Sequence, residues 1–379
     1  MNASVVLFDE ITTASGLKAG VARLNSPQTL NGLSLEMCEL LTQKFTQWSN
    51  DPSIALVILR GEGDKAFSAG GDLHGLYKGM LENTSGNAWN NVHARTFFDI
   101  EYRLDYLIHT FPKPLLCWGS GIVMGGGVGL MMGASHRVVT ETTRFAMPEI
   151  SIGLFPDVGG TWMLSRLPGG IGTFLALTGA QLGARDCHLL GLSDYIVAAD
   201  AYDTLIEQIT QSHWTTCRTA NDARLREVIL HLEPETLPPA GPLGQHFAEI
   251  RQACDGNDFN AIVANIAAWV THTDPWLSRA AKTFLAGSPG SARLSFTLLK
   301  RVRFMSLADV FREEYIVSLN CGIQGDFQEG IRALLIDKDK SPRWNPSGHD
   351  QATDDWVQCF FNTPWPAGQP HPLADLGNP

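Results

Sequence analysis

Hydrophobic and polar positions in the first part of the chain follow two alternating periods. The segment "IALVILRG" (54–61) is a short run of hydrophobic and β-branched residues, which predicts a strand buried on both faces. The segment "GVARLN" (20–25) predicts another strand. Between these strands, hydrophobic residues recur at helical spacing from Leu33 to Trp48, with Ser34 as a candidate N-cap. Strand, helix and strand in succession are typical of an α/β fold.

The same rhythm continues further along the chain. The segment "PLLCWGSGIV" (114–123) predicts a hydrophobic strand, "MGGGVGLMMGA" (124–134) predicts the opening of a helix, and "HRVVTET" (136–142) predicts a further strand. No internal repeat is visible in the sequence itself. The pattern therefore predicts an α/β core without showing how its elements are stacked.

The pattern changes after about residue 200. Helical periodicity then prevails without matching strands, and Ser306 and Asp309 have the spacing of a capping box before one of these helices. The end of the chain is rich in Trp, Pro, Asp and Gly. We therefore expect three regions: an α/β core over 1–200 that carries the site, a helical region over 201–340, and an irregular tail over 341–379.

Composition narrows the class of protein. The 379 residues are 44% hydrophobic, enough for a large core, and the net charge of −11 argues against nucleic acid as a partner. The seven cysteines are scattered and never form a C-x-x-C pair, which favours buried thiols in a reducing compartment over disulfides or zinc. The start "MNASVVLFDE" lacks the features of a signal peptide, and no hydrophobic run reaches membrane-spanning length. We expect a cytoplasmic protein that binds no membrane and no metal.

Two carboxylates stand in an otherwise apolar segment. "FAMPEISIGLFPDVGG" (145–160) contains Glu149 and Asp157 among hydrophobic residues and glycines. Burial there would raise the pKa of Glu149 towards that of a useful base, and a nearby Asp157 would separate the two pKa values further. The alternative interpretations are structural. Glu149 could be a helix-start acid satisfied by backbone N–H groups, and Asp157 could cap the helix of "GGTWMLSRL" (159–167).

Two glycine segments follow predicted strands. "FSAGGDL" (67–73) and "MGGGVGL" (124–130) would let backbone N–H groups approach a ligand closely. One N–H group from each segment could hold an oxygen that becomes negative during a reaction. Tight turns and close helix packing explain the glycines equally well. A dinucleotide-binding pattern is excluded, because Leu130 stands where its third glycine is required.

Together these segments resemble the crotonase (enoyl-CoA hydratase/isomerase) superfamily. "KAFSAGGDL", "GIVMGGGVGL" and "FAMPEISIGLFPDVGGTWMLSRLPG" occur in the order and at the spacing of that family. The segment "DFQEGIRALLIDKDKSPRWNP" (326–346) is most similar to its 3-hydroxyisobutyryl-CoA hydrolases. The resemblance implies an α/β spiral of repeated ββα units (the ClpP-like crotonase fold) with helices at the C-terminal end. It also implies an acyl-CoA thioester as substrate, with CoA as part of the substrate and no further cofactor.

The resemblance also assigns roles to residues. It implies that the backbone N–H groups of Gly71 and Gly126 polarise the thioester carbonyl, that Glu149 is the catalytic glutamate, and that Asp157 meets the acyl group. Glu101, in "FFDIEYRL", matches a further carboxylate near the substrate. The other residues that it places at the substrate are Ala69, Gly70, Asp72 and Gly125.

Departures from the hydratases indicate which reaction to expect. Hydratases carry a second glutamate at the position of Gly129 and tend to carry glycine at that of Asp157. Glycine cannot perform acid–base chemistry, so alkene hydration would lack one of its two carboxylates. Certain dienoyl-CoA isomerases share the pair of Glu and Asp, so the choice rests on the C-terminal segment "GIRALLIDKD", which is similar to the hydrolases. We therefore expect a thioester hydrolase of the 3-hydroxyisobutyryl-CoA type, which serves valine degradation. An enoyl-CoA or dienoyl-CoA isomerase or a hydratase is the alternative enzyme, and an acyl-CoA-binding protein the non-enzymatic one. The sequence leaves open whether Glu149 acts as a base or forms an anhydride, and whether the protein is a homo-oligomer.

Cations near the glycine segments are candidates for contacts with the CoA phosphates. Arg60, Lys65 and Lys113 lie close to these segments in the sequence or flank the neighbouring strands. Exposed cations usually belong to a solvated surface, so we expect at most one of them to meet a phosphate.

Overall fold

The computed structural model describes residues 4–378, and the chain divides into two compact units. Unit 1 comprises Met1–Gly71, Arg103–Phe145 and Leu182–Gln245, and unit 2 comprises Asp72–Tyr102, Ala146–Gln181 and His246–Pro379. Each unit is thus assembled from three separate stretches of the chain, and each is described by itself.

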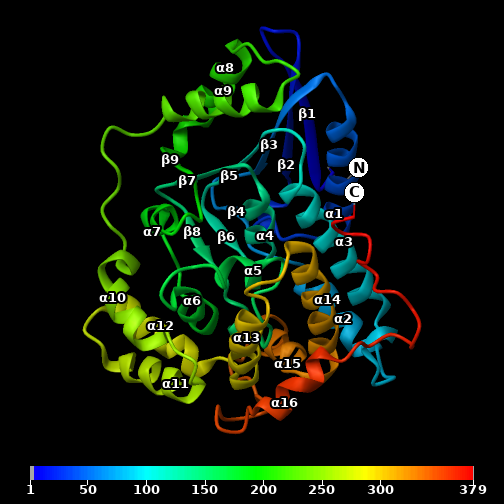
Figure 1. Cartoon of the computed structure of the whole chain (residues 1–379), viewed down its shortest axis with the longest axis vertical. Coiled ribbons are helices and arrows are strands. Elements are labelled where there is room, and N and C mark those ends of the chain that lie inside the picture. Colours follow the sequence, from blue (N-terminus) through cyan, green and yellow to red (C-terminus); the bar gives the residue numbers. More distant parts are fainter. Residues whose placement is uncertain (1–3, 379) are drawn as a thin grey trace. The chain divides into compact units, whose positions relative to one another are not determined.

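Unit 1 is built on a six-stranded sheet with the order β1-β2-β3-β5-β7-β9 (Figure 1). Its strands are β1 (Val6–Thr12), β2 (Lys18–Leu24), β3 (Ile54–Gly61), β5 (Leu115–Gly119), β7 (His136–Thr140) and β9 (Tyr195–Val197). β1 pairs antiparallel with β2, and the other pairs are parallel. The strand predicted over 54–61 is confirmed as β3, which is buried throughout except at Arg60. Such burial on both faces explains its continuous hydrophobic run.

A second sheet has three short strands in the order β4-β6-β8. They are β4 (Ala66–Ser68), β6 (Ile122–Met124) and β8 (Arg144–Ala146). After each of β3, β5 and β7 the chain therefore enters a strand of the small sheet, and a helix follows. This is the expected repeat of ββα units. The single strand predicted over 114–123 is wrong, because Gly121, with φ of +70°, separates β5 from β6.

Helices cover the sheet of unit 1. They are α1 (Leu35–Asn50), α4 (Gly126–Gly133), α7 (Ala184–Leu189), α8 (Tyr202–Gln211) and α9 (Arg218–Leu230). The Ser34 side chain accepts a hydrogen bond from the Met37 N–H, which confirms the predicted cap of α1. Side chains of α8 and α9, such as Leu205 and Leu225, share a buried cluster with Trp118 of the sheet. These two helices therefore complete the core of unit 1 on that face (Figure 1).

Unit 2 is mainly helical. It contains α2 (Leu73–Glu82), α5 (Gly160–Leu164), α6 (Ile171–Thr178), α11 (Phe259–Ala268), α12 (Pro275–Ala286), α13 (Pro289–Arg301), α14 (Leu307–Gln324), α15 (Phe327–Ile331) and α16 (Asp354–Gln358), with the first part of α3 (Val92–His109) and most of α10 (Pro242–Cys254). Ser306 caps α14 by accepting from the Asp309 N–H, as predicted. The Tyr102 ring of α3 packs on Phe311 of α14 with their centroids 5.6 Å apart. This α3–α14 contact carries the polar residues described below.

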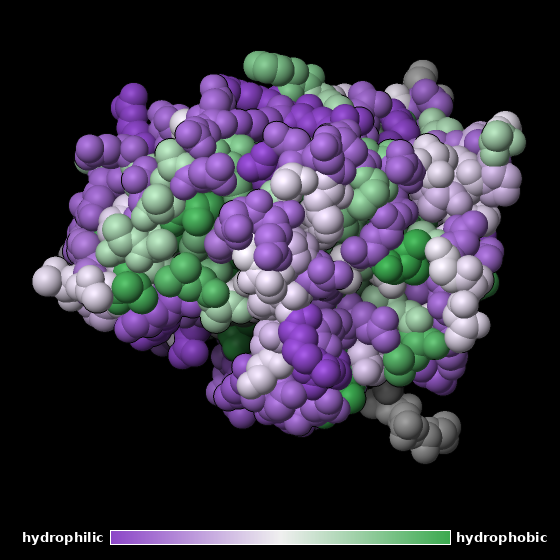
Figure 2. Space-filling view, turned by 90° about the horizontal axis from the view of Figure 1, so that it is seen from below, coloured by the Kyte–Doolittle hydropathy of each residue, from purple (hydrophilic) through white to green (hydrophobic). Residues whose placement is uncertain are grey.

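Hydrophilic residues cover most of the face shown in Figure 2, and hydrophobic residues form small groups between them. Among the described residues, the most exposed large hydrophobic side chain is that of Phe304, at 92%. Within residues 4–378, no helix combines the length and the hydrophobicity needed to cross a membrane.

Candidate active site

The two glycine segments lie next to each other in unit 1. Gly71 follows β4, and Gly126 is the first residue of α4, directly after β6. A Cβ atom built on Gly70 would lie 3.7 Å from the Gly126 nitrogen. Gly70 and Gly125 have φ of +110° and +51°, and other residues rarely adopt such values. Glycine is therefore required for the backbone path that brings the segments together.

The backbone N–H groups of these segments differ in availability. The Ala69 N–H donates to the Leu30 carbonyl at 3.0 Å, so the fold already uses it. Among residues 4–378, the Gly71 and Gly126 N–H groups donate no hydrogen bond to a carbonyl. The Gly126 N–H also belongs to the first turn of α4, where the helix dipole favours negative charge. Each of the two loops thus has an N–H group that the backbone does not use, and the role of these groups as an oxyanion hole stays a prediction.

Close packing explains other glycines of the same segment. A Cβ atom on Gly127 would lie 2.6 Å from the Ser68 carbonyl oxygen, which is closer than real Cβ contacts. The structural interpretation therefore holds for Gly127, which lets α4 approach β4. The functional interpretation of Gly126 stays a prediction. Asp72, expected at the substrate, caps α2 by accepting from the Gly75 N–H at 3.1 Å. Its contact with substrate stays a prediction.

The three predicted carboxylates all belong to unit 2 and are buried. Glu101 lies on α3, Glu149 begins the 3-10 helix η3 (Glu149–Ile152), and Asp157 lies in the turn before α5. Their exposed fractions are 2%, 4% and 5%. The negative charge of Asp157 acts on the pKa of both glutamates. The structure therefore gathers into one electrostatic cluster three acids that are up to 56 positions apart in the sequence.

Burial raises the pKa of all three acids. It raises the pKa of Glu149 and of Glu101 well above the usual range, and repulsion from Asp157 adds to both effects. Burial also raises the pKa of Asp157, to about 6, where a hydrogen bond from Tyr102 opposes the rise. The charge of Asp157 thus favours the protonated form of both glutamates.

The structural interpretation holds in part for Glu149, which begins η3 and accepts from its own backbone N–H, and does not hold for Asp157. The Glu149 Oε2 atom has no hydrogen-bond partner among residues 4–378, so backbone N–H groups do not satisfy the whole carboxyl group. Asp157 does not cap α5, because the N-cap position is Gly159 and no side chain from the turn caps it. The Asp157 carboxylate instead accepts from the Tyr102 hydroxyl, with 2.8 Å between Oδ2 and the phenol oxygen.

Three residues near Asp157 were not predicted from the sequence: Tyr102, Glu314 and Ser318. The Tyr102 hydroxyl is hydrogen-bonded to Ser318 Oγ at 2.7 Å as well as to Asp157. Glu314 is fully buried and accepts from the Gly159 N–H at 2.8 Å and from the N–H and hydroxyl of Thr161. Glu314 therefore caps α5 in place of Asp157.

The positions of Glu314 and Ser318 in the helical pattern of the sequence could have identified them. Both stand at helical spacing from Phe311 in "DVFREEYIVSL" (309–319), on the hydrophobic face of the predicted helix. An acid on such a face needs a partner, and this requirement marks Glu314 as a residue to explain.

Two of the three candidate cations have structural roles within unit 1. The Lys113 ammonium donates to the carbonyl oxygens of Trp48 and Asp51, at the end of α1. The Arg60 guanidinium lies over the Tyr202 ring, 4.0 Å from its centroid. A contact of Lys65 with a CoA phosphate stays a prediction.

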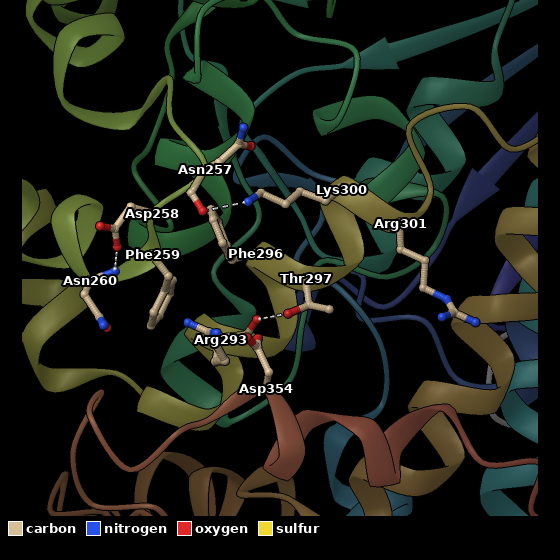
Figure 3. A pocket seen from close by; sticks show the side chains of 10 residues that line it. All are labelled: Asn257, Asp258, Phe259, Asn260, Arg293, Phe296, Thr297, Lys300, Arg301 and Asp354. Atoms are coloured by element: carbon tan, nitrogen blue, oxygen red, sulfur yellow. Dashed lines mark hydrogen bonds and ion pairs between the residues drawn. The ribbon is translucent and has the colours of Figure 1, made fainter.

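A groove of about 800 Å³ opens between α11, α13 and α16 of unit 2 (Figure 3). It is lined by Asn257, Asp258, Phe259, Asn260, Arg293, Phe296, Thr297, Lys300, Arg301 and Asp354. Arg293 pairs with Asp354. The Lys300 ammonium donates to the Asn257 carbonyl oxygen, as a dashed line in Figure 3 marks. None of the predicted site residues lines this groove, and its main cations are already paired. We assign it no chemistry.

Comparison with known proteins connects these features to a family. Residues 19–361 match the enoyl-CoA hydratase/isomerase family. Three similar relatives are named 3-hydroxyisobutyryl-CoA hydrolase, mitochondrial. The Gallus gallus protein is 37% identical over 90% of this chain and 86% of its own, the Danio rerio protein 36% over 94% and 89%, and the Xenopus tropicalis protein 35% over 91% and 86%.

Solved structures confirm the predicted fold class. A structure described as an enoyl-CoA hydratase from Rhodobacter sphaeroides 2.4.1 has a TM-score of 0.80 at 32% identity and covers 94% of this chain and 97% of its own. One described as a carnitinyl-CoA dehydratase from Mycobacterium thermoresistibile has a TM-score of 0.83 at 32% identity, with 95% and 97% covered.

The predicted cytoplasmic location is wrong by this comparison, because the relatives are mitochondrial enzymes. The features used for the prediction, scattered cysteines and a start unlike a signal peptide, separate reducing compartments from the secretory pathway. They do not separate one reducing compartment from another.

Proposed function

We propose that this chain, which belongs to the enoyl-CoA hydratase/isomerase family, hydrolyses the thioester of 3-hydroxyisobutyryl-CoA. The observation that supports this most is the buried pair Glu149 and Asp157, combined with glycine at position 129. Such a site has carboxylates for hydrolysis and lacks the second glutamate of a hydratase. The products are 3-hydroxyisobutyrate and free CoA, which fits a step in valine degradation.

The proposed reaction uses two backbone N–H groups as hydrogen-bond donors and Glu149 as the base. The Gly71 and Gly126 N–H groups stabilise the negative charge that develops on the carbonyl oxygen, and losing one such donor typically costs about 3–4 kcal/mol of barrier. In one route, Glu149 takes a proton from water, the hydroxide adds to the carbonyl carbon, and the C–S bond breaks. Glu149 then returns the proton to the CoA thiolate.

In the other route, the Glu149 carboxylate attacks the carbonyl carbon itself and expels the CoA thiolate, which takes up a proton. Water then cleaves the mixed anhydride and restores Glu149. In both routes Glu149 reacts in its deprotonated form, so its raised pKa makes turnover increase with pH. Trapping of an acylated Glu149 by hydroxylamine would identify the second route.

We assign Asp157 to the hydroxyl group of the acyl chain. A carboxylate accepts hydrogen bonds, and the acyl hydroxyl can donate one to Asp157. A substrate without that hydroxyl leaves a buried acceptor unmatched, at a cost of about 1–3 kcal/mol. We therefore expect 3-hydroxyisobutyryl-CoA to exceed isobutyryl-CoA in kcat/KM by at least about tenfold. In Asp157→Ala this ratio should narrow.

The alternative reactions make different products. The two solved structures carry the names of a hydratase and a dehydratase, so alkene chemistry is the alternative to hydrolysis. Hydration or isomerisation changes the acyl double bond and releases no thiol. An acyl-CoA-binding protein would release no thiol and change no double bond.

One assay of the purified chain separates these functions. Free thiol is followed with a chromogenic disulfide reagent for 3-hydroxyisobutyryl-CoA, isobutyryl-CoA and crotonyl-CoA, and the enoyl absorbance is followed in parallel. Enzyme alone is the blank, because Cys217 is exposed and reacts with the reagent. We expect thiol release from the hydroxylated ester. A change of enoyl absorbance without thiol release from any ester would overturn the hydrolase proposal.

A further inference from the structure

Tyr102 joins Asp157 to helix α14 through a directed chain of hydrogen bonds. Its ring and hydroxyl are fully buried, and the hydroxyl lies 2.8 Å from Asp157 Oδ2 and 2.7 Å from Ser318 Oγ. The phenol has one proton. Because the phenol donates this proton in its hydrogen bond to the Asp157 carboxylate, the Ser318 hydroxyl must be the donor in the hydrogen bond between Ser318 and the phenol oxygen. In this arrangement Asp157 is an acceptor, and its orientation is set by a rigid aromatic side chain.

The ring of Tyr102 has little freedom to move. It packs on Phe98 and on Phe311, with centroid distances of 5.6 Å to each. Tyr315 meets it edge-on at 6.5 Å. The phenol oxygen is therefore held in place by the packing of α3 on α14 and not by the hydrogen bond to Asp157 alone.

Helix α14 also holds the backbone beside Asp157. Glu314 stands one turn before Ser318 and accepts from the N–H groups of Gly159 and Thr161, two and four residues after Asp157. One face of α14 thus fixes the Asp157 side chain through Ser318 and Tyr102, and the following backbone through Glu314.

We propose that Tyr102, held in place by Ser318, is a positioning residue that orients the Asp157 carboxylate and keeps it an acceptor for the hydroxyl of the acyl group. This role deepens the proposed function and rests on it for the identity of the acyl group. The hydrogen bonds that orient Asp157 lie within unit 2.

Electrostatics around Asp157 support the same role. Its electrostatic neighbours are acids or neutral groups with raised pKa values, namely Glu101, Tyr102, Glu149, Glu314 and Cys321. Burial raises the pKa of Asp157, while the Tyr102 hydroxyl and the backbone N–H of Asp157 itself lower it. Tyr102 is thus the side chain that opposes protonation of Asp157.

The test compares Tyr102→Phe with the wild type. The change keeps the ring and removes the hydroxyl, so the Asp157 pKa should rise. Because the acceptor is lost as pH falls through that pKa, the preference for 3-hydroxyisobutyryl-CoA over isobutyryl-CoA should be lost at a pH about one unit higher, for one lost hydrogen bond to a charged group. The ionisation of Glu149 affects both esters and cancels from this ratio. Selectivity over isobutyryl-CoA should fall at least about threefold, as half a pKa unit would give.

Two further variants keep the result interpretable. Ser318→Ala leaves the phenol but removes its donor, and it should shift the pH at which the preference between the two esters is lost in the same direction by a smaller amount. Tyr315→Phe is the matched control, because it removes another buried tyrosine hydroxyl of unit 2, one that donates to the Arg95 carbonyl. Its pH profile and selectivity should equal those of the wild type. An equal shift in Tyr315→Phe, or none in Tyr102→Phe and Ser318→Ala, would overturn the positioning role.

A direct titration separates this role from the proposed activity. The chain is labelled with aspartate carrying ¹³C at the carboxyl carbon, and the Asp157 signal is assigned by its absence in Asp157→Asn. Its midpoint should lie at higher pH in Tyr102→Phe than in the wild type, whether or not any ester is hydrolysed. Unchanged midpoints would refute the inference, whereas shifted midpoints without thiol release in the wild type would refute only the hydrolase proposal.

Discussion

Glu314 should make the stability of the protein depend on pH in a defined direction. Burial raises its pKa from 4.5 to about 8. Between these values the folded protein holds a proton that the unfolded chain has already lost. The free energy of unfolding therefore falls as pH rises through this window, by up to about 1.4 kcal/mol per pH unit. In Glu314→Gln, an amide that does not titrate takes the same place. The unfolding free energy of this variant should therefore fall less steeply with pH than that of the wild type, by up to about 1.4 kcal/mol per pH unit.

The contacts of Glu314 determine how much unfolding free energy is lost when its side chain is truncated to alanine. Its carboxyl group accepts from two backbone N–H groups and from the Thr161 hydroxyl. Losing a cap costs about 1 kcal/mol, and a buried donor left without an acceptor costs about 1–3 kcal/mol. The Thr161 hydroxyl can rotate to another acceptor, so we count one orphaned N–H group. Glu314→Ala should then be destabilised by about 3 kcal/mol, and Glu314→Gln by less, because its amide oxygen still accepts.

Urea unfolding followed by circular dichroism between about pH 5 and 8 measures both effects. Glu313→Gln is the matched control, because it removes the neighbouring acid of α14, which pairs with Arg301. Its unfolding free energy should change by a constant amount across this range. Equal slopes for the wild type and Glu314→Gln, or an alanine variant as stable as the wild type, would refute the assignment of Glu314 as a buried, proton-holding cap.

Three further predictions concern the proposed reaction. Glu149→Gln should lower kcat by at least about 100-fold with little change in KM, and near-normal turnover of the folded variant would contradict its role. Gly127→Ala places a Cβ atom 2.6 Å from the Ser68 carbonyl oxygen, so α4 must shift. Both the melting temperature and kcat should therefore fall, and a variant unchanged in both would contradict this packing. Gly129→Glu restores the carboxylate of a hydratase, and we expect slower thiol release with a trace of crotonyl-CoA hydration. An unchanged rate of thiol release would show that position 129 does not affect the site.

Local sequence patterns predicted much of unit 1. The run over 54–61 became β3 with the same bounds, and Ser34 caps α1, because burial on both faces and an N-cap each leave a mark within a few neighbouring residues. The break at Gly121 was missed. The reason is tertiary: a Cβ atom there would lie 2.4 Å from the Lys65 carbonyl oxygen, a contact between two ββα units. The ββα repeat itself was likewise invisible as a sequence repeat and appears only in the order of the strands.

The sequence likewise indicated part of the candidate site, and the rest is visible only in the folded structure. The chain by itself indicated which residues to propose for the chemistry, because glycines after strands and acids in an apolar segment are recognisable one segment at a time. Only the tertiary structure decided what surrounds Asp157, since Tyr102 and Ser318 are 216 positions apart yet share one hydrogen bond. The pKa values of the acids depend on that assembly, because burial and neighbouring charge are properties of the packed unit and not of any one segment. The same assembly made Glu314, and not Asp157, the cap of α5.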